Sequence, residues 1–188
     1  MTSLDPEERC VALNVEGVEV ATLNMGSVNF FEGVYVNTPS DIELWANRMK
    51  KKKIIPELCI FEAGMIENVK KLELKNLLGK NRYYNFSLGF PGAMPATLNN
   101  LILLIDSIPQ NSPWFYVEHG LKNFMPVVRA ISMNGHVRAG FEDNVYLDEN
   151  TKASSNHVLV EKVSNLAVEM GRKIVDAAKA REILGLKG

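Results

Sequence analysis

The sequence has few of the features that identify several large classes of protein. Its 188 residues include only two cysteines, Cys10 and Cys59, which lie far apart and form no CxxC pair. Their number and spacing exclude a disulfide framework and a thiolate zinc site, so we expect two reduced thiols. Basic and acidic residues nearly balance, 21 against 22, which argues against a nucleic-acid or membrane-surface partner.

Long apolar runs and targeting signals are missing as well. No run approaches the roughly 18 apolar residues of a membrane-spanning helix. Residues 1–9 carry acidic side chains and lack the apolar core of a secretory signal, so we expect a cytoplasmic protein. The length suits a single domain over residues 1–188, because no repeat or linker marks a second one.

Common catalytic motifs are also absent. The sequence contains no GxxxxGK[ST] phosphate loop, no GxSxG nucleophile elbow and no HxH or HExxH pair. A complete zinc site therefore cannot be built from obvious motifs. None of the expected strands contains a lysine, which disfavours a metal-independent aldolase that forms a Schiff base.

What is present is a regular alternation of strand-like and helix-like segments. Strands are expected at 18–24, 57–61, 82–88, 114–118 and 135–143, with a polar loop after the first and helices between the rest. Expected helix N-caps are Thr97, Asn156, Asp176 and, for the first helix, either Thr38 (before Pro39) or Ser40 (with Glu43 three residues on). Five consecutive strand–helix units predict parallel strands joined by right-handed crossovers. They fit either an open doubly wound sheet or part of a (β/α)₈ barrel.

The positions of polar residues favour the barrel. Candidates fall at strand ends and just beyond: Thr22, Asn24, Glu62, Asn85, Ser87, Glu118, His119, Glu142 and Asp143. In a barrel, the carboxyl ends of several strands converge on one site. A standard barrel has eight strands in about 250 residues, so we expect an incomplete (β/α)₈ TIM-barrel type with about five β/α units.

The segment from Gly135 to Asn144 is the strongest candidate for chemistry. Strict alternation would place Arg138 and Glu142 on one strand face about 13 Å apart, too far for easy direct pairing. Each charge would then need another partner, a divalent metal for Glu142 and a substrate carboxylate or phosphate for Arg138. The alternative is a solvated strand whose charges bond to neighbouring strands.

Several segments together resemble the β-keto acid cleavage enzymes, a family typified by the 3-keto-5-aminohexanoate cleavage enzyme of lysine fermentation. The segments are Gly135–Asn144, Ser155–Asn156, Ala180–Leu186, Ala21–Phe30 and Pro56–Phe61, within a resemblance from about Pro6 to Leu186. The resemblance implies a (β/α)₈ barrel, zinc at the carboxyl ends of the strands and an oligomer. It also implies an acyltransferase, in which a β-keto acid and acetyl-CoA give acetoacetate and a new CoA thioester.

The resemblance also assigns roles to individual residues. Glu142 becomes the zinc-binding carboxylate, and Asp143 and Arg138 become the catalytic pair that manages charge and proton transfer. Three further residues match positions that line the substrate pocket: Glu57, Thr22 and Asn24. At Asn134 many members have glycine, and asparagine tolerates similar backbone angles.

The main difference from the family is at the N-terminal end of the chain. Family members resemble this chain only after three earlier strands, which include the HxH pair that supplies the other zinc ligands. We therefore expect a C-terminal portion that by itself binds zinc weakly and lacks catalysis, since one carboxylate without two imidazoles is a poor zinc site. The alternative is a non-catalytic remnant or interaction subunit that pairs an exposed edge strand with a partner.

Overall fold

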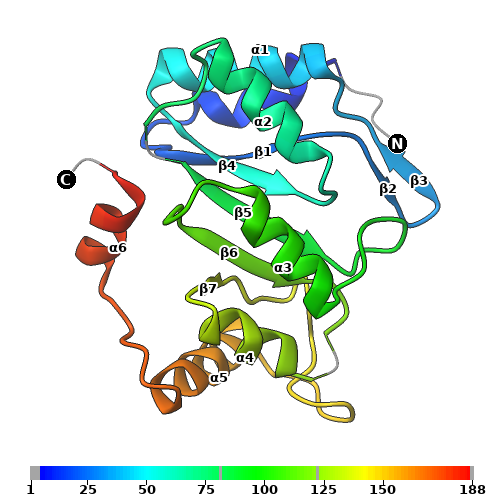
Figure 1. The fold of residues 1–188 in the computed structure, drawn as a ribbon, viewed down its shortest axis with the longest axis vertical. Helices are drawn as coiled ribbons and strands as arrows, with labels where there is room; N and C mark the ends of the chain where they lie inside the picture. Colours follow the sequence, from blue (N-terminus) through cyan, green and yellow to red (C-terminus); the bar gives the residue numbers. More distant parts are fainter. Residues whose placement is uncertain (1–4, 81, 122, 187–188) are drawn as a thin grey trace.

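The computed structural model describes residues 5–80, 82–121 and 123–186. Its centre is a five-stranded parallel sheet with the strand order β1-β4-β5-β6-β7 (Figure 1). These strands are β1 Val20–Asn24, β4 Ile55–Ile60, β5 Tyr83–Leu88, β6 Trp114–Glu118 and β7 His136–Val137. The order in this sheet follows the chain without reversal, as in a (β/α)₈ barrel, whereas a doubly wound sheet reverses at a switch point. The predicted incomplete barrel is therefore confirmed.

One short helix precedes β1, and the helices that follow the strands cover one face of the sheet, except the last. The helices are η1 Glu8–Asn14, α1 Pro39–Lys52, α2 Met65–Leu74, α3 Leu98–Ser107, α4 Met125–Ser132, α5 Asn156–Glu169 and α6 Ala177–Leu184. In Figure 1, α6 stands apart from the others on the side where the strands begin. Both terminal guanidinium nitrogens of Arg181 bond to the carboxylate of Glu19, which attaches α6 to the start of β1. None of the described helices is long and apolar enough to cross a membrane.

The main apolar core lies between the helices and the helix-facing side of the sheet. Leu23, Leu58, Tyr84 and Phe86 alternate along their strands on this side, and each is at most 1% exposed. The opposite face carries a row of polar side chains: Thr22, Glu57, Asn85 and Ser87. Parallel strands are usually apolar on both faces, so this polar face is where a functional site is expected.

Three of the predicted helix N-caps are confirmed. The Thr38 hydroxyl accepts a hydrogen bond from Asp41 N–H at 3.2 Å, and the Asp41 carboxylate accepts one from Thr38 N–H, which completes a capping box before Pro39. Thr97 and Asp176 accept the equivalent bonds at the starts of α3 and α6, at 3.2 and 2.8 Å. The local sequence thus determines where these helices begin.

Two residues at the later end of the chain behave differently. Ser155, not Asn156, occupies the N-cap of α5, so that prediction was wrong. The Asn156 side chain instead accepts a hydrogen bond from Phe141 N–H at 2.7 Å, which ties the start of α5 to the loop after β7. Asn134 has a φ of 67°, which is the left-handed conformation. This agrees with the glycine that many family members have at this position, since asparagine also tolerates such angles.

A short hairpin replaces the polar loop expected after β1. Strands β2 (Val28–Phe30) and β3 (Gly33–Tyr35) pair antiparallel. The Phe30 ring stacks on Phe90 with centroids 5.3 Å apart, and Phe31 meets the His119 ring edge-on, also at 5.3 Å. Since Phe90 and His119 follow β5 and β6, these rings hold the hairpin against the carboxyl ends of the strands.

The fifth strand of the sheet is much shorter than the predicted 135–143. Strand β7 ends at Val137, although Arg138 N–H still bonds to Tyr116 C=O at 3.0 Å. Beyond it, the Gly140 carbonyl accepts hydrogen bonds from the N–H groups of both Asp143 and Asn144, at 3.1 and 2.9 Å. The chain therefore turns where strict alternation predicted an extended strand.

Candidate functional site

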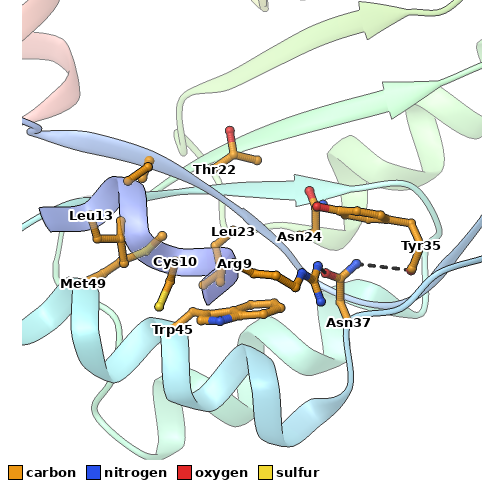
Figure 2. A pocket seen from close by; sticks show the side chains of 12 residues that line it. Arg9, Cys10, Leu13, Thr22, Leu23, Asn24, Tyr35, Asn37, Trp45 and Met49 are labelled. Atoms are coloured by element: carbon orange, nitrogen blue, oxygen red, sulfur yellow. Dashed lines mark hydrogen bonds between the residues drawn. The ribbon is translucent and has the colours of Figure 1, made fainter. Parts of the chain in front are cut away.

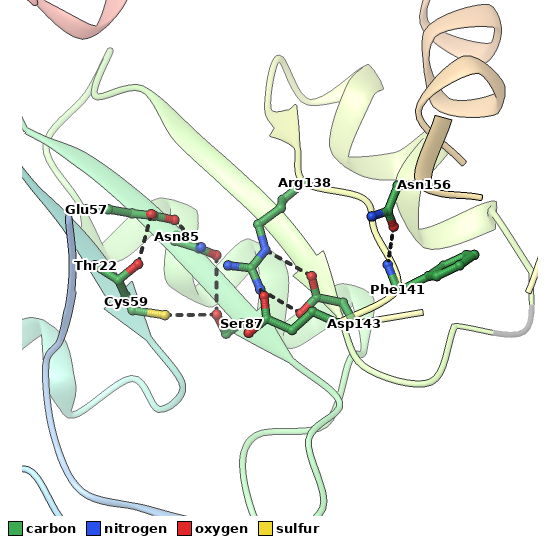
Figure 3. Close-up of polar contacts among 10 residues, drawn as sticks. Thr22, Glu57, Cys59, Asn85, Ser87, Arg138, Phe141, Asp143 and Asn156 are labelled. Atoms are coloured by element: carbon green, nitrogen blue, oxygen red, sulfur yellow. Dashed lines mark hydrogen bonds and ion pairs between the residues drawn. The ribbon is translucent and has the colours of Figure 1, made fainter. Parts of the chain in front are cut away.

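The turn after β7 brings three charged side chains into contact. Arg138 Nε donates to Asp143 Oδ2 at 2.9 Å and Nη2 donates to Asp143 Oδ1 at 2.7 Å (Figure 3). The same Nη2 reaches Glu142 Oε2 at 3.2 Å. The prediction that Arg138 and Glu142 lie too far apart for direct pairing was wrong, because it assumed that the strand continued.

The two carboxylates beside Arg138 differ sharply in burial. The Asp143 side chain is 4% exposed and that of Glu142 is 83% exposed. The hydrogen bonds with Asp143 are the largest cause of a raised Arg138 pKa, and the charges of Asp143, Glu142 and Glu57 add to it. The Asp143 carbonyl also accepts a hydrogen bond from Gly120 N–H at 3.0 Å, so the loop after β6 helps to fix this residue. Asp143 is thus held both by its side chain and by its backbone.

A second set of polar side chains runs across strands β1, β4 and β5 (Figure 3). Glu57 accepts hydrogen bonds from Thr22 Oγ1, at 3.2 Å, and from Asn85 Nδ2. Asn85 Oδ1 in turn accepts from the Ser87 hydroxyl at 3.3 Å, and Ser87 Oγ lies 3.1 Å from Cys59 Sγ. Asn85 is fully buried, so these bonds fix the Glu57 carboxylate on the polar face of the sheet.

Cys59 connects the two sets electrostatically. Burial raises the pKa of its thiol to about 12, and the charges of Glu57, Arg138 and Asp143 all act on it. Figure 3 shows both sets over the same part of the sheet, and together they form the candidate site. The sequence alone predicts Asn85 and Ser87 only as strand-end candidates and Cys59 only as a reduced thiol. The register that pairs Cys59 with Asn85 was the missing information.

Asn24 does not join this network. It lines a hollow of about 240 Å³ beside β1, bounded by η1 and α1 (Figure 2). Arg9 crosses this hollow and donates to the Val36 carbonyl and to Asn37 Oδ1, both at 2.7 Å. Thr22 lines the hollow and also bonds to Glu57, so it belongs to both places.

The remaining strand-end candidates contribute little to this face. Glu118 accepts a hydrogen bond from the Tyr116 hydroxyl at 2.5 Å, and burial raises the pKa of its carboxyl group. Burial likewise raises the pKa of Glu62. His119 Nδ1 is buried and has no hydrogen-bond partner among the residues that the structure describes.

The described residues do not by themselves fit a zinc ion. Within ranges 5–80, 82–121 and 123–186, no three His, Cys, Asp or Glu side chains are grouped so that they could hold a metal. Glu142 is well exposed, and its carboxylate contacts a guanidinium group. A carboxylate in this position can supply at most one of the ligands that a tetrahedral zinc site needs.

Comparisons with known proteins agree with the family that the motifs suggest. The family model for the beta-keto acid cleavage enzyme matches residues 1–186. The 3-keto-5-aminohexanoate cleavage enzyme of Fusobacterium nucleatum is 38% identical over 170 residues, which is 90% of this chain and 62% of that protein. The 3-oxoadipate:acetyl-CoA acetyltransferase of Cupriavidus necator is 33% identical over 171 residues, 89% of this chain and 60% of that protein.

A solved structure shows the same fold at lower sequence similarity. The binary complex of ObcA with oxaloacetate has a TM-score of 0.73 at 19% identity, and the match covers 90% of this chain and 46% of that one. The chain thus spans about 62% of the F. nucleatum relative and less than half of the ObcA chain.

Proposed function

Because this chain belongs to the beta-keto acid cleavage enzyme family, we propose that its site serves an acyl exchange between a β-keto acid and acetyl-CoA. In this exchange the bond between the keto carbon and C2 of the acid breaks, and C2 bonds to the acetyl carbonyl carbon. The CoA sulfur leaves the acetyl group and bonds to the released acyl group. The products are acetoacetate and a new CoA thioester, so the activity is that of an acyltransferase.

The observation that carries this proposal is the two-point pairing of Arg138 with a buried Asp143 at the carboxyl ends of the strands. A guanidinium group held in this way keeps its positive charge and is oriented for a carboxylate or keto oxygen. Asp143 is the partner that accepts or returns a proton as charge shifts during the exchange. Arg138 and Asp143 are thus the proposed catalytic pair.

Three other residues, Glu57, Thr22 and Asn24, are proposed to line the substrate pocket. Thr22 and Asn85 fix the carboxylate of Glu57, which therefore presents a defined negative charge to a bound substrate. Asn24 borders the neighbouring hollow and would contact a more distant part of the substrate. Names of relatives point to 3-keto-5-aminohexanoate, an intermediate of lysine fermentation, as the first acid to test.

A zinc site at this position would need further ligands besides those of the described residues. When bound, zinc would polarise keto and carboxylate oxygens as a Lewis acid. Glu142 is the carboxylate proposed to contact it. Since the described residues offer no complete site, we expect this chain alone to bind zinc weakly and to show no turnover. An oligomer of completed barrels in the cytoplasm is proposed from the same family resemblance.

Titration with acetoacetate, the product shared by all such exchanges, tests the proposal without requiring turnover. In NMR spectra of the chain, acetoacetate should shift the Arg138 Nε–H resonance and the Asn85 side-chain amide. Arg138→Lys should abolish the response, whereas Arg129→Lys on the exposed side of α4 should leave it intact. A spectrum unchanged at high acetoacetate concentration would favour the alternative function, a non-catalytic interaction subunit.

A further inference from the structure

The turn after β7 is the feature that brings Arg138 and Asp143 together. The Gly140 carbonyl accepts the N–H groups of Asp143 and Asn144, at 3.1 and 2.9 Å, so the turn satisfies these two amides by itself. N–H groups that come earlier in such a turn have no carbonyl partner within it, as at the start of a helix. Phe141 N–H is such a group, so it depends on a partner outside the turn, a side chain or water.

Three hydrogen bonds tie this turn to other parts of the described chain. Main-chain groups of β6 and of the loop after it hold the two ends of the turn, at Arg138 and Asp143, by bonds of 3.0 Å each. The third bond holds the middle of the turn, because Asn156 Oδ1 of α5 accepts from Phe141 N–H at 2.7 Å (Figure 3). Since this third partner is a side chain, a single substitution can remove it.

The side-chain amide of Asn156 is fixed in one orientation on a packed helix. Phe141 N–H can only donate, so the amide atom that meets it must be the oxygen. A Cβ on Gly140 would lie 3.4 Å from the same oxygen, which therefore sits against the point where the chain turns. Asn156 is the first residue of α5, a helix of 14 residues that buries Leu159 and Ala167 in an apolar cluster. The acceptor is thus carried by an element with its own packing.

We propose that Asn156 is a positioning residue for the proposed catalytic pair. By holding Phe141 N–H, it keeps the chain turned at Gly140, and the turned chain keeps the Asp143 carboxylate on the Arg138 guanidinium group. Without this bond the Phe141 amide would pair with water, and the turn would open locally for part of the time. The inference rests on the proposed function, because the pair serves acyl exchange only if that function is correct.

Two substitutions of Asn156 and a matched control test this role. Asn156→Ala removes the acceptor, and α5 should stay intact because alanine is a better helix former than asparagine. Asn156→Asp keeps an oxygen at the same place and should preserve the bond to Phe141 N–H. His157→Ala is the control, because His157 is the next residue of α5, is also exposed and forms none of the three hydrogen bonds that hold the turn.

The Arg138 Nε–H group supplies the measurement, because its bond to Asp143 Oδ2, at 2.9 Å, depends on the turn. In NMR spectra of the full chain, Asn156→Ala should speed hydrogen exchange of this group about fivefold, the population change expected from the loss of one hydrogen bond. Acetoacetate binding should weaken by a similar factor. Asn156→Asp and His157→Ala should keep the wild-type Nε–H resonance and exchange rate. The urea midpoint of Asn156→Ala should match that of His157→Ala, because the opening is local.

The proposal is overturned if Asn156→Ala leaves the Arg138 Nε–H resonance and its exchange rate unchanged. It is also overturned if Asn156→Asp disturbs them as much as Asn156→Ala does. A urea midpoint of Asn156→Ala that falls in step with the faster exchange would overturn it too, since general destabilisation would then explain the result. Failure of acetoacetate to bind the wild type would contradict the proposed function. The change in Nε–H exchange of the free protein would still support the positioning role of Asn156.

Discussion

Asp143 receives two hydrogen bonds from Arg138, at 2.9 and 2.7 Å, although only 4% of its side chain is exposed. A carboxylate that is buried to this extent is tolerated only with partners that replace its lost hydration. Its sequence neighbour Glu142 touches the same guanidinium group but remains in water. The two adjacent carboxylates therefore depend on Arg138 to very different degrees.

Replacing Arg138 with methionine should lower the free energy of unfolding by about 2 kcal/mol. The loss of one partner from a fully buried pair costs roughly 3–5 kcal/mol, and the value is smaller here because Arg138 is 36% exposed. Urea unfolding measures the change. Glu142→Gln is the control and should change stability by less than about 0.5 kcal/mol. Equal effects of the two variants would contradict the difference in burial.

Gly135→Ala should destabilise the protein by about 2–3 kcal/mol, because a Cβ at this position would overlap the buried Trp114 ring. Gly64→Ala is the matched control, since a Cβ there meets open space at the start of α2. Gly64 has helical backbone angles that alanine adopts without strain, so we expect the control to lose no more than about 0.5 kcal/mol. Thermal unfolding of the two variants compares them directly, and a stable Gly135→Ala protein would rule out this close packing.

Cys59 should make stability depend on alkaline pH. Burial raises its thiol pKa from 9.0 to about 12, so the folded state keeps a proton that the unfolded chain releases. The resulting stabilisation is complete below pH 9 and is lost as pH rises from 9 toward 12. Relative to Cys59→Ala, the wild type should lose up to about 1.4 kcal/mol per pH unit in this range. Urea unfolding at pH 8, 9 and 10 measures the slope, and parallel pH profiles would contradict it.

The link between Glu19 and Arg181 should control the opening of α6. Arg181 lowers the Glu19 pKa, so the link persists at neutral pH and is lost as falling pH protonates the carboxylate. Glu19→Gln should speed hydrogen exchange of the amides of Ala177–Leu184 several-fold at pH 7, and Glu16→Gln should not. At acidic pH, wild type and Glu19→Gln should exchange alike. A difference that persists in acid would show that another contact holds the helix.

Local signals in the sequence predicted the parts of the fold that depend on local physics. Thr38 and Asp176 begin helices because their own oxygens satisfy nearby N–H groups. Alternation over 135–143 is also a local signal, but Asp143 obtains its guanidinium partner only when the chain turns at Gly140. The alternation of apolar and polar residues in the sequence gives no sign of this pairing between Asp143 and Arg138.

The sequence predicts individual residues of the candidate site but not the hydrogen bonds that join them. Arg138 and Asp143 stand out as charges in the predicted strand 135–143, and the family resemblance adds Glu57. The bonds that join Glu57 to Asn85 and Ser87 to Cys59 depend on the register between β4 and β5. Register arises from packing of the whole sheet, so no short segment of the chain contains it.

Because the strands of the sheet follow their order in the chain, the sheet can grow during synthesis by adding each strand to the one made just before it. Each strand then pairs with the strand of the neighbouring unit. Arg138 and Asp143 come from the last unit of this series, whereas Glu57 is in place much earlier. On a ribosome, the polar face would stay without its guanidinium group until the segment after β6 has emerged. Ribosome-bound chains that end before Gly135 should therefore lack the guanidinium group on which the proposed substrate site depends.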